Sequence, residues 1–356
     1  MKYSKVMQSH ENIVSLFSDK PIQTITEKDT SHGEQDFREV LFVTFRDGSR
    51  LVIKLADNGF TDDAHLKMWR RTVEEYLKLD VYCPRIFLAL DGTFPHVCYE
   101  GRTCIAYAEE FAPYRAASDW EEAKISKDGR YTYIEDVLMM NARMASQQHD
   151  YTDLPSGYCL FEVFDPSDPC DEVLENARNW YDTAKAAVPA PLLPQVEQIW
   201  DRWLNNRAAL EPLYQKLPRS VFQADLNPSN ILLDDSGNFL GICDFNIAGR
   251  DVFLNYLMRE VPYIIYASDM SSDEDRVLHA IQYALRIVSR TYCFSDAEKQ
   301  AALPLYRCLK PLWWTSVQEL KETGQDPEAL RKHLDHVEYM QTREIDFAAD
   351  MGAQFK

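Results

Sequence analysis

The chain has 356 residues, a formal net charge of −19 at pH 7, and 46% hydrophobic residues. This apolar content excludes a disordered protein, and the length allows one large core or two lobes. The negative charge argues against nucleic acid or an anionic membrane surface as a partner. It suits a cationic small molecule, although acidity for solubility alone is the alternative.

Targeting signals and metal-binding cysteine patterns are missing from the sequence. No apolar run approaches the length of about 18 residues that a membrane span needs, and residues 1–17 do not resemble a secretory signal. The eight cysteines are scattered and include no C-x-x-C pair. This pattern favours free thiols over disulfides or zinc. We therefore expect a cytoplasmic protein.

The first third of the chain alternates short apolar segments with polar turns, which is typical of an antiparallel sheet. A short amphipathic helix is expected within residues 1–18. Strands are expected at residues 21–25, 39–46 and 50–55. Residues 30–36 are polar and turn-forming, and they separate the first two strands. A helix is expected at residues 63–79, because apolar residues recur along one of its faces.

Beyond about residue 113 the pattern is mostly helical. Helices are expected at residues 133–149, 172–185 and 193–217, and from 251 to the end. Residues 150–169 are rich in Pro and Asp and predict a loop or insertion. The aromatic residues after 251 are more typical of a core than of a binding site. His333 and His336 are expected on a solvated helix surface rather than at a metal.

The most informative segment lies between Phe222 and Asp251. A short apolar run leads into Asp225, and Asn230 follows five residues later. Two apolar runs flanking the turn at 234–238 predict a β-hairpin, and its second strand ends on Asp244. The hairpin would return Asn230 and Asp244 to the same end, beside Asp225. Oxygen ligands of this kind suit magnesium shared with phosphates, and Asp225 would accept the proton of an attacking hydroxyl.

These residues resemble the catalytic and metal-binding loops of the aminoglycoside phosphotransferase and choline kinase-like family. The resemblance implies that Asp225 is the catalytic Asp and that Asn230 and Asp244 hold Mg²⁺. It implies a bilobal protein-kinase-like α+β fold, in which a small antiparallel-sheet N-lobe precedes a larger, mainly helical C-lobe. We expect the N-lobe at residues 1–112 and the C-lobe, with an acceptor region built from helices and the insertion, at 113–356.

The same resemblance assigns the nucleotide site. Lys54 would pair with the phosphates of ATP or GTP and with a Glu of the following helix. Glu74 is favoured for this partner, with Glu75 as the alternative. The backbone of Glu110, Phe111 and Ala112 would hydrogen-bond the nucleobase.

The loop over the phosphates matches the family least well. It contains Gly33 but no G-x-G-x-x-G, so Ser31, His32 and Gly33 would present backbone N–H groups to the phosphates. Gln223 and Asn246 stand where the family often has His and Gly. Neither change removes a group with a direct chemical role.

The expected function is therefore transfer of the γ-phosphate of ATP or GTP to a hydroxyl of a small acceptor, and the net charge leaves both a cationic and an uncharged acceptor open. A protein Ser/Thr kinase is disfavoured by Asn227 in place of Lys and by the missing A-P-E. A nucleotide-binding regulatory pseudokinase is the other alternative. The oligomeric state and the acceptor stay open.

Overall fold

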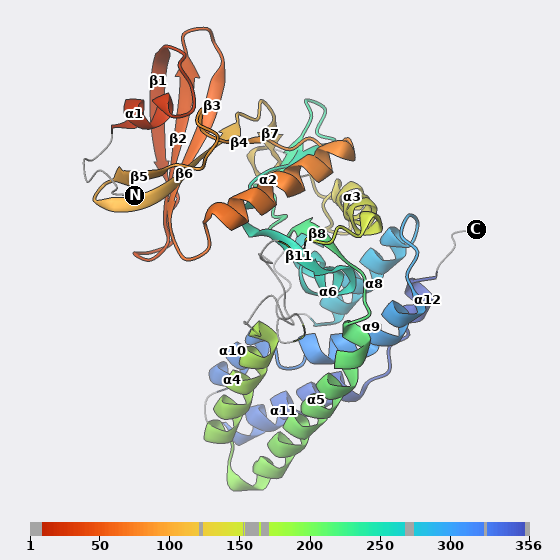
Figure 1. Cartoon of the computed structure of the whole chain (residues 1–356). Coiled ribbons are helices and arrows are strands. Elements are labelled where there is room, and N and C mark those ends of the chain that lie inside the picture. The colour runs from red at the N-terminus through yellow and green to blue at the C-terminus, as the bar shows by residue number, and fades with distance from the viewer. Residues whose placement is uncertain are drawn as a thin grey trace. The chain divides into compact units, whose positions relative to one another are not determined.

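The computed structural model describes residues 9–120, 124–151, 153, 164, 171–267, 274–323 and 326–352. Strands dominate the N-terminal part and helices the C-terminal part, as Figure 1 shows from red to blue. The chain divides into two compact units. The first comprises Met1–Glu122, Asp153–Gly157 and Asp225–Ala248, and the second comprises Ala123–Thr152, Tyr158–Ala224 and Gly249–Lys356.

A six-stranded antiparallel sheet forms the centre of the first unit. Its order is β1-β2-β3-β6-β4, and β5 also pairs with β6. The strands are β1 (Ile22–Asp29), β2 (Phe37–Phe45), β3 (Arg50–Asp57), β4 (Ile86–Phe87), β5 (His96–Tyr99) and β6 (Arg102–Glu110). The first strand extends four residues beyond its predicted end, because Asp29 still pairs with Glu39 across the hairpin.

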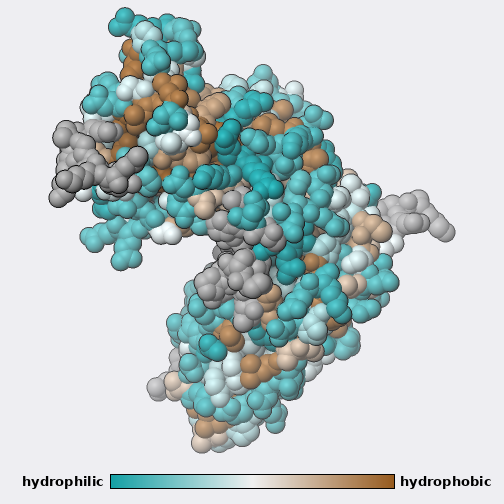
Figure 2. All heavy atoms as spheres, viewed as in Figure 1, coloured by the Kyte–Doolittle hydropathy of each residue, from teal (hydrophilic) through white to brown (hydrophobic). Residues whose placement is uncertain are grey.

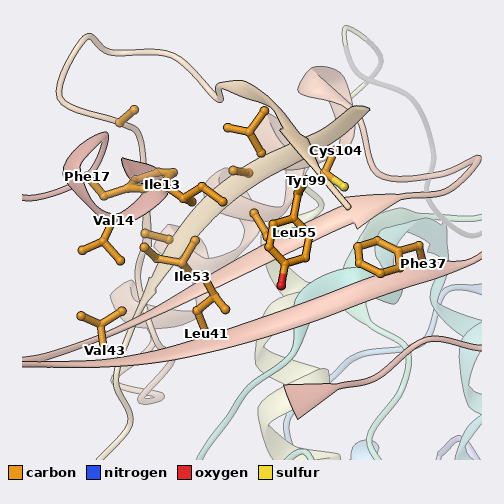
Figure 3. Close-up of a cluster of buried hydrophobic side chains, with 14 of the residues drawn as sticks. Ile13, Val14, Phe17, Phe37, Leu41, Val43, Ile53, Leu55, Tyr99 and Cys104 are labelled. Carbon is orange, nitrogen blue, oxygen red and sulfur yellow. The ribbon is translucent and has the colours of Figure 1, made fainter. Parts of the chain in front are cut away.

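One face of this sheet carries a hydrophobic core. In β2, buried and half-buried residues alternate strictly, as a strand with one buried face requires. Figure 3 shows Leu41 and Ile53 of the sheet directed toward the helix α1 (His10–Ser15), whose Ile13 and Val14 are fully buried. Side chains alternate along a strand, so Lys54 lies on the opposite face from Ile53.

The helix α2 (Asp63–Lys78) completes the N-terminal part of the first unit. Asp62 caps it by accepting hydrogen bonds from the N–H groups of Ala64 and His65. Its buried face includes Trp69 and Tyr76, and the ring of Tyr76 meets Phe245 edge-on at 5.7 Å.

A second small sheet in the first unit has the order β10-β9-β7. Its strands are β7 (Arg115–Ala116), β9 (Ile231–Leu233) and β10 (Phe239–Ile242). The turn between β9 and β10 closes on the Asp234 carboxylate, which accepts from the N–H groups of Ser236 and Asn238. The predicted hairpin is therefore present. A parallel bridge from Tyr82 to Gly241 joins it to the rest of the unit.

The second unit is mainly helical. Its elements are α3 (Ile134–Gln147), α4 (Glu172–Ala187), α5 (Leu193–Tyr214), β8 (Arg219–Gln223), β11 (Ala248–Val252), α6 (Phe253–Arg259), α7 (Val261–Ile265), α8 (Glu274–Val288), α9 (Asp296–Leu309), α10 (Trp314–Glu322), α11 (Pro327–Thr342) and α12 (Phe347–Asp350). The long helix α5 packs on α9, and Trp203 of α5 donates from Nε1 to the Cys308 carbonyl at 3.1 Å. Of the described helices, none has the length and apolar run of a membrane span.

Of the sequence predictions for this unit, one is wrong and another falls mostly outside the described residues. His333 of α11 is buried and accepts a hydrogen bond from Trp180 Nε1 at 3.1 Å, so its predicted place on the solvated surface is wrong. Helix periodicity alone did not reveal that α4 covers it. Most of the predicted insertion at 150–169 lies outside the described residues. The six described cysteines are free thiols. Hydrophilic residues predominate on the face of the molecule that Figure 2 shows.

Candidate active site

The segment Asp225–Asn230 is organised around the carboxylate of Asp225. Asn227 donates from Nδ2 to one carboxylate oxygen at 2.6 Å, and Asn230 donates from Nδ2 to the other at 3.1 Å. Asn230 Nδ2 also donates to the backbone carbonyl of Asp225 at 2.8 Å. The amide nitrogen of Asn230 is thus directed at Asp225, which makes its Oδ1 the atom suited to a cation.

The β9–β10 hairpin brings Asn230 and Asp244 to the same end. Ile231 pairs with Ile242, and the Cys243 N–H donates to the Asn230 carbonyl at 2.9 Å. Asp244 follows in a left-handed backbone conformation with φ of 59°, which few non-glycine residues adopt. Such conformations persist only where the surroundings impose them, and they concentrate at functional sites. The hairpin therefore places Asn230 and Asp244 at the same end, and a shared site of their side chains with Asp225 stays a prediction.

Asp244 is also part of a three-charge cluster with Lys54 and Glu109. Lys54 Nζ lies 2.9 Å from Asp244 Oδ1 and 3.0 Å from Glu109 Oε2. The registers of β2, β3 and β6 explain this, because Lys54 pairs with Val40 on one side and with Tyr107 on the other. Glu109, two residues beyond Tyr107, shares that face of the sheet.

The protonation states of the cluster are set by burial and by the pairing of one ammonium, that of Lys54, with two carboxylates. Burial by itself would lower the pKa of Lys54, but the charges of Asp244 and Glu109 raise it well above its usual value. Burial raises the pKa of Glu109 against the opposing charge of Lys54. Burial opposes the ionisation of Asp244, but the charge and hydrogen bond of Lys54, together with the charge of Arg38, lower its pKa. Asp244 therefore stays ionised, as a metal ligand must be.

A cavity of about 160 Å³ opens beside this cluster within the first unit. The residues that line it include Arg38, Lys54, Phe60, Tyr107 and Asp244. Among the described residues, no group of three or more His, Cys, Asp or Glu side chains is arranged to hold a metal. An amide oxygen and an ionised carboxylate are donor types that Mg²⁺ takes together with phosphates and water, so a magnesium site at Asn230 and Asp244 stays a prediction.

The loop between β1 and β2 does not offer the backbone donors that the sequence predicted. The Ser31 N–H donates to the Asp29 carboxylate at 2.8 Å, and the His32 N–H donates to the Asp36 carbonyl at 3.0 Å. Gly33 has a φ of 93° and forms the turn itself. Two of the three predicted N–H donors are therefore engaged within the turn.

The sequence comparison settles the family. A family model described as the phosphotransferase enzyme family (APH) matches residues 31–254, which is more than half of the 356 residues. The chain belongs to the phosphotransferase enzyme family. A search of curated proteins gave no match.

Solved structures support the same fold for this phosphotransferase-family chain. It is similar to an aminoglycoside phosphotransferase from Alicyclobacillus acidocaldarius subsp. acidocaldarius, with a TM-score of 0.51 and 15% identity over 98% of this chain and 96% of that one. It is also similar to a microcompartment-associated aminopropanol kinase, with a TM-score of 0.53 and 11% identity over 92% and 93% of the two chains. Identities this low show the fold alone, and the predicted α+β kinase-like fold is confirmed.

The predicted partner of Lys54 needs a correction in this phosphotransferase. Glu74 lies on the solvent side of α2, where its carboxylate is 3.7 Å from Arg70. Glu75 lies 2.9 Å from Lys78. Glu109 holds Lys54 instead. Strand alternation after Tyr107 was the signal for Glu109, but it could be used only once β6 was known to pair with β3.

Two residues of the segment predicted to bind the nucleobase already contact other residues of the chain. Glu110 ends β6, and its N–H donates to the Arg85 carbonyl at 2.8 Å. The guanidinium of Arg50 lies 3.4 Å from the centre of the Phe111 ring. Phe111 and Ala112 are half-buried. A role of Glu110, Phe111 and Ala112 in base binding stays a prediction, with the Glu110 N–H already occupied.

Proposed function

We propose that this member of the phosphotransferase enzyme family is a small-molecule kinase. It transfers the γ-phosphate of ATP or GTP to a hydroxyl group of a small acceptor. The observation that carries the proposal is the Asp225 carboxylate, fixed by the amides of Asn227 and Asn230 beside Asp244.

Each group has a defined task in this reaction. The acceptor oxygen attacks the γ-phosphorus, and the bond between the γ-phosphorus and the β–γ bridging oxygen breaks. The proton of the acceptor hydroxyl passes to Asp225. Lys54 binds the phosphates. Mg²⁺ held by Asn230 and Asp244 would neutralise charge on the phosphates. Positioning and charge stabilisation supply most of the rate enhancement, as in other phosphoryl transfers.

Asn227 supports a small-molecule kinase over a protein kinase. Protein kinases generally carry Lys at this position, whereas here the amide of Asn227 donates to the Asp225 carboxylate. The amide orients Asp225 without adding a positive charge beside it. The net charge of −19 supports a cationic acceptor such as an aminoglycoside or an amino alcohol.

A panel assay tests the proposal. The chain is incubated with Mg²⁺ and ATP or GTP in the presence of aminoglycosides, macrolides, amino alcohols or sugars. Nucleoside diphosphate release and the mass of each acceptor are measured. We expect one acceptor class to stimulate release and to gain one phosphate. Nucleotide binding without transfer to any class would favour the regulatory pseudokinase instead.

A further inference from the structure

The predicted phosphate-binding groups of the first unit are largely occupied by contacts within the chain. Lys54 already faces two carboxylates, so the cluster with Glu109 and Asp244 carries a net negative charge. The N–H groups of Ser31 and His32 close their own turn. Mg²⁺ would neutralise part of the charge of a nucleoside triphosphate, but its terminal phosphate still needs hydrogen-bond donors that these groups do not supply.

Arg38 of β2 is placed to supply such donors. It lines the same 160 Å³ cavity as Lys54 and Asp244. A single water needs only about 10–15 Å³ of such space, so the cavity can hold a group of several heavy atoms.

The register of the sheet places Arg38 at the far end of the nucleotide face. Glu110, where the predicted base-binding segment starts, pairs with Leu51 of β3. Lys54 lies three residues further along β3, and Ala56, which pairs with Arg38, lies five residues along. At about 3.3 Å per residue these steps are ~10 Å and ~17 Å from Leu51. Arg38 thus lies beyond Lys54, where the chain of phosphates ends.

The Arg38 guanidinium is also oriented in advance. Its Nε and Nη2 each donate to the Asp36 carboxylate at 2.7 Å, and Asn58 Nδ2 donates to the same carboxylate at 3.0 Å. The guanidinium lies 4.9 Å from the centre of the Phe60 ring. Within the described part of the chain, Nη1 has no hydrogen-bond partner. Arginine binds phosphate well because its planar fork offers several donors at fixed angles.

We propose that Arg38 binds the terminal phosphate of the nucleoside triphosphate and replaces the backbone donors that the β1–β2 loop lacks. This proposal rests on the proposed kinase function. Asp36 and Asn58 act as positioning residues that hold the guanidinium against the cavity wall.

Equilibrium binding to the full chain tests the proposal. Affinities for the magnesium triphosphate, the diphosphate and the nucleoside are measured by calorimetry for wild type, Arg38→Gln and Arg38→Lys. Arg46→Gln is the matched control, because it removes one positive charge at an exposed position in the turn that follows the same strand. Thermal melting of each variant reports whether it is folded.

We expect Arg38→Gln to weaken triphosphate binding by about tenfold or more, the scale of a lost hydrogen bond to a charged group. Diphosphate binding should fall less and nucleoside binding should not change. Arg38→Lys should be intermediate and Arg46→Gln should match wild type. A folded Arg38→Gln that binds triphosphate like wild type, or that loses triphosphate and nucleoside equally, would overturn the role of Arg38 alone. Wild type that binds no nucleotide would overturn the proposed function as well.

Discussion

At the scale of single residues, the cluster of Lys54, Glu109 and Asp244 concentrates charge in a largely buried place. Lys54 is 18% exposed and Glu109 11% exposed at their side chains. Removing one partner from such a cluster leaves the others without compensation, which is costlier than breaking a surface pair.

Lys54→Met should therefore destabilise the fold by about 3–5 kcal/mol, because two carboxylates lose their shared ammonium. Lys20→Met is the control, since Lys20 pairs with Asp47 at the exposed surface and should cost at most about 1 kcal/mol. Urea unfolding at neutral pH measures both. Adding Glu109→Gln to Lys54→Met should recover part of the loss. Equal costs for the two lysines would show that the cluster carries no special energy.

A second residue prediction concerns Glu39, which is 7% exposed on β2. Burial raises its pKa from 4.5 to about 6, and neighbouring carboxylates add to the rise. The folded chain then holds this proton more tightly than the unfolded chain. The residue costs stability as the pH rises from about 4.5 through 6, and the full cost applies above that range.

Glu39→Gln should consequently raise the melting temperature near about pH 8, and the gain should vanish near about pH 4.5. Glu34→Gln, at an exposed position of the adjoining loop, should change neither value. Scanning calorimetry across this range measures both variants. A gain from Glu39→Gln that is independent of pH would contradict the assigned titration.

At the scale of elements, the β9–β10 hairpin positions Asn230 and Asp244, and Tyr82 holds the hairpin in place. The Tyr82 N–H donates to the Leu240 carbonyl at 3.2 Å, and the Ile242 N–H donates to the Tyr82 carbonyl at 2.9 Å. Gly241 lies between these bonds. A side chain there would meet backbone rather than a flexible neighbour.

Gly241→Ala should destabilise the chain by about 1–3 kcal/mol and lower phosphoryl transfer, because its Cβ would lie 1.9 Å from the Tyr82 carbonyl oxygen. Gly59→Ala is the matched control, since a Cβ at Gly59 meets nothing within 4 Å. Urea unfolding and turnover are measured for both. Wild-type stability in Gly241→Ala would mean that the bridge to Tyr82 does not hold the hairpin.

Elements with strong local signals could be predicted from sequence. The β9–β10 hairpin was predicted because Asp234 and Gly237 mark its turn between two apolar runs, and the spacing of Asp225, Asn230 and Asp244 then followed. The partner of Lys54 was not predicted correctly, because Glu109 comes close to Lys54 only when β6 pairs with β3. The β1–β2 loop was mispredicted for a similar reason, since the Ser31 N–H bonds to a side chain, Asp29, that composition does not reveal.

At the scale of the whole molecule, Asp225–Ala248 belongs to the same compact unit as Lys54. The nucleotide-facing groups proposed here therefore share one unit. The lobe boundary near residue 112 stays a prediction from the sequence. The net charge of −19 acts on every approaching ligand, and salt screens it over about 10 Å at 0.1 M ionic strength.

If the acceptor is cationic, its kcat/KM should fall several-fold between low and roughly 0.3 M salt, because screening weakens long-range attraction. A neutral acceptor, such as a sugar phosphorylated by the same chain, should show little dependence. Steady-state kinetics with sodium chloride and with a second salt separate screening from ion-specific inhibition. A cationic acceptor with no salt dependence would show that net charge plays no part in its capture.

The most direct measurement compares Asp225→Asn with Asp235→Asn in transfer of labelled γ-phosphate to the acceptor. Asp235 is an exposed residue of the β9–β10 turn and provides a matched charge change. We expect Asp225→Asn to lower transfer by about 10²–10⁴-fold while nucleotide affinity is kept, because proton removal is lost and binding is not. Asp235→Asn should match wild type. Transfer at the wild-type rate by Asp225→Asn would contradict the account.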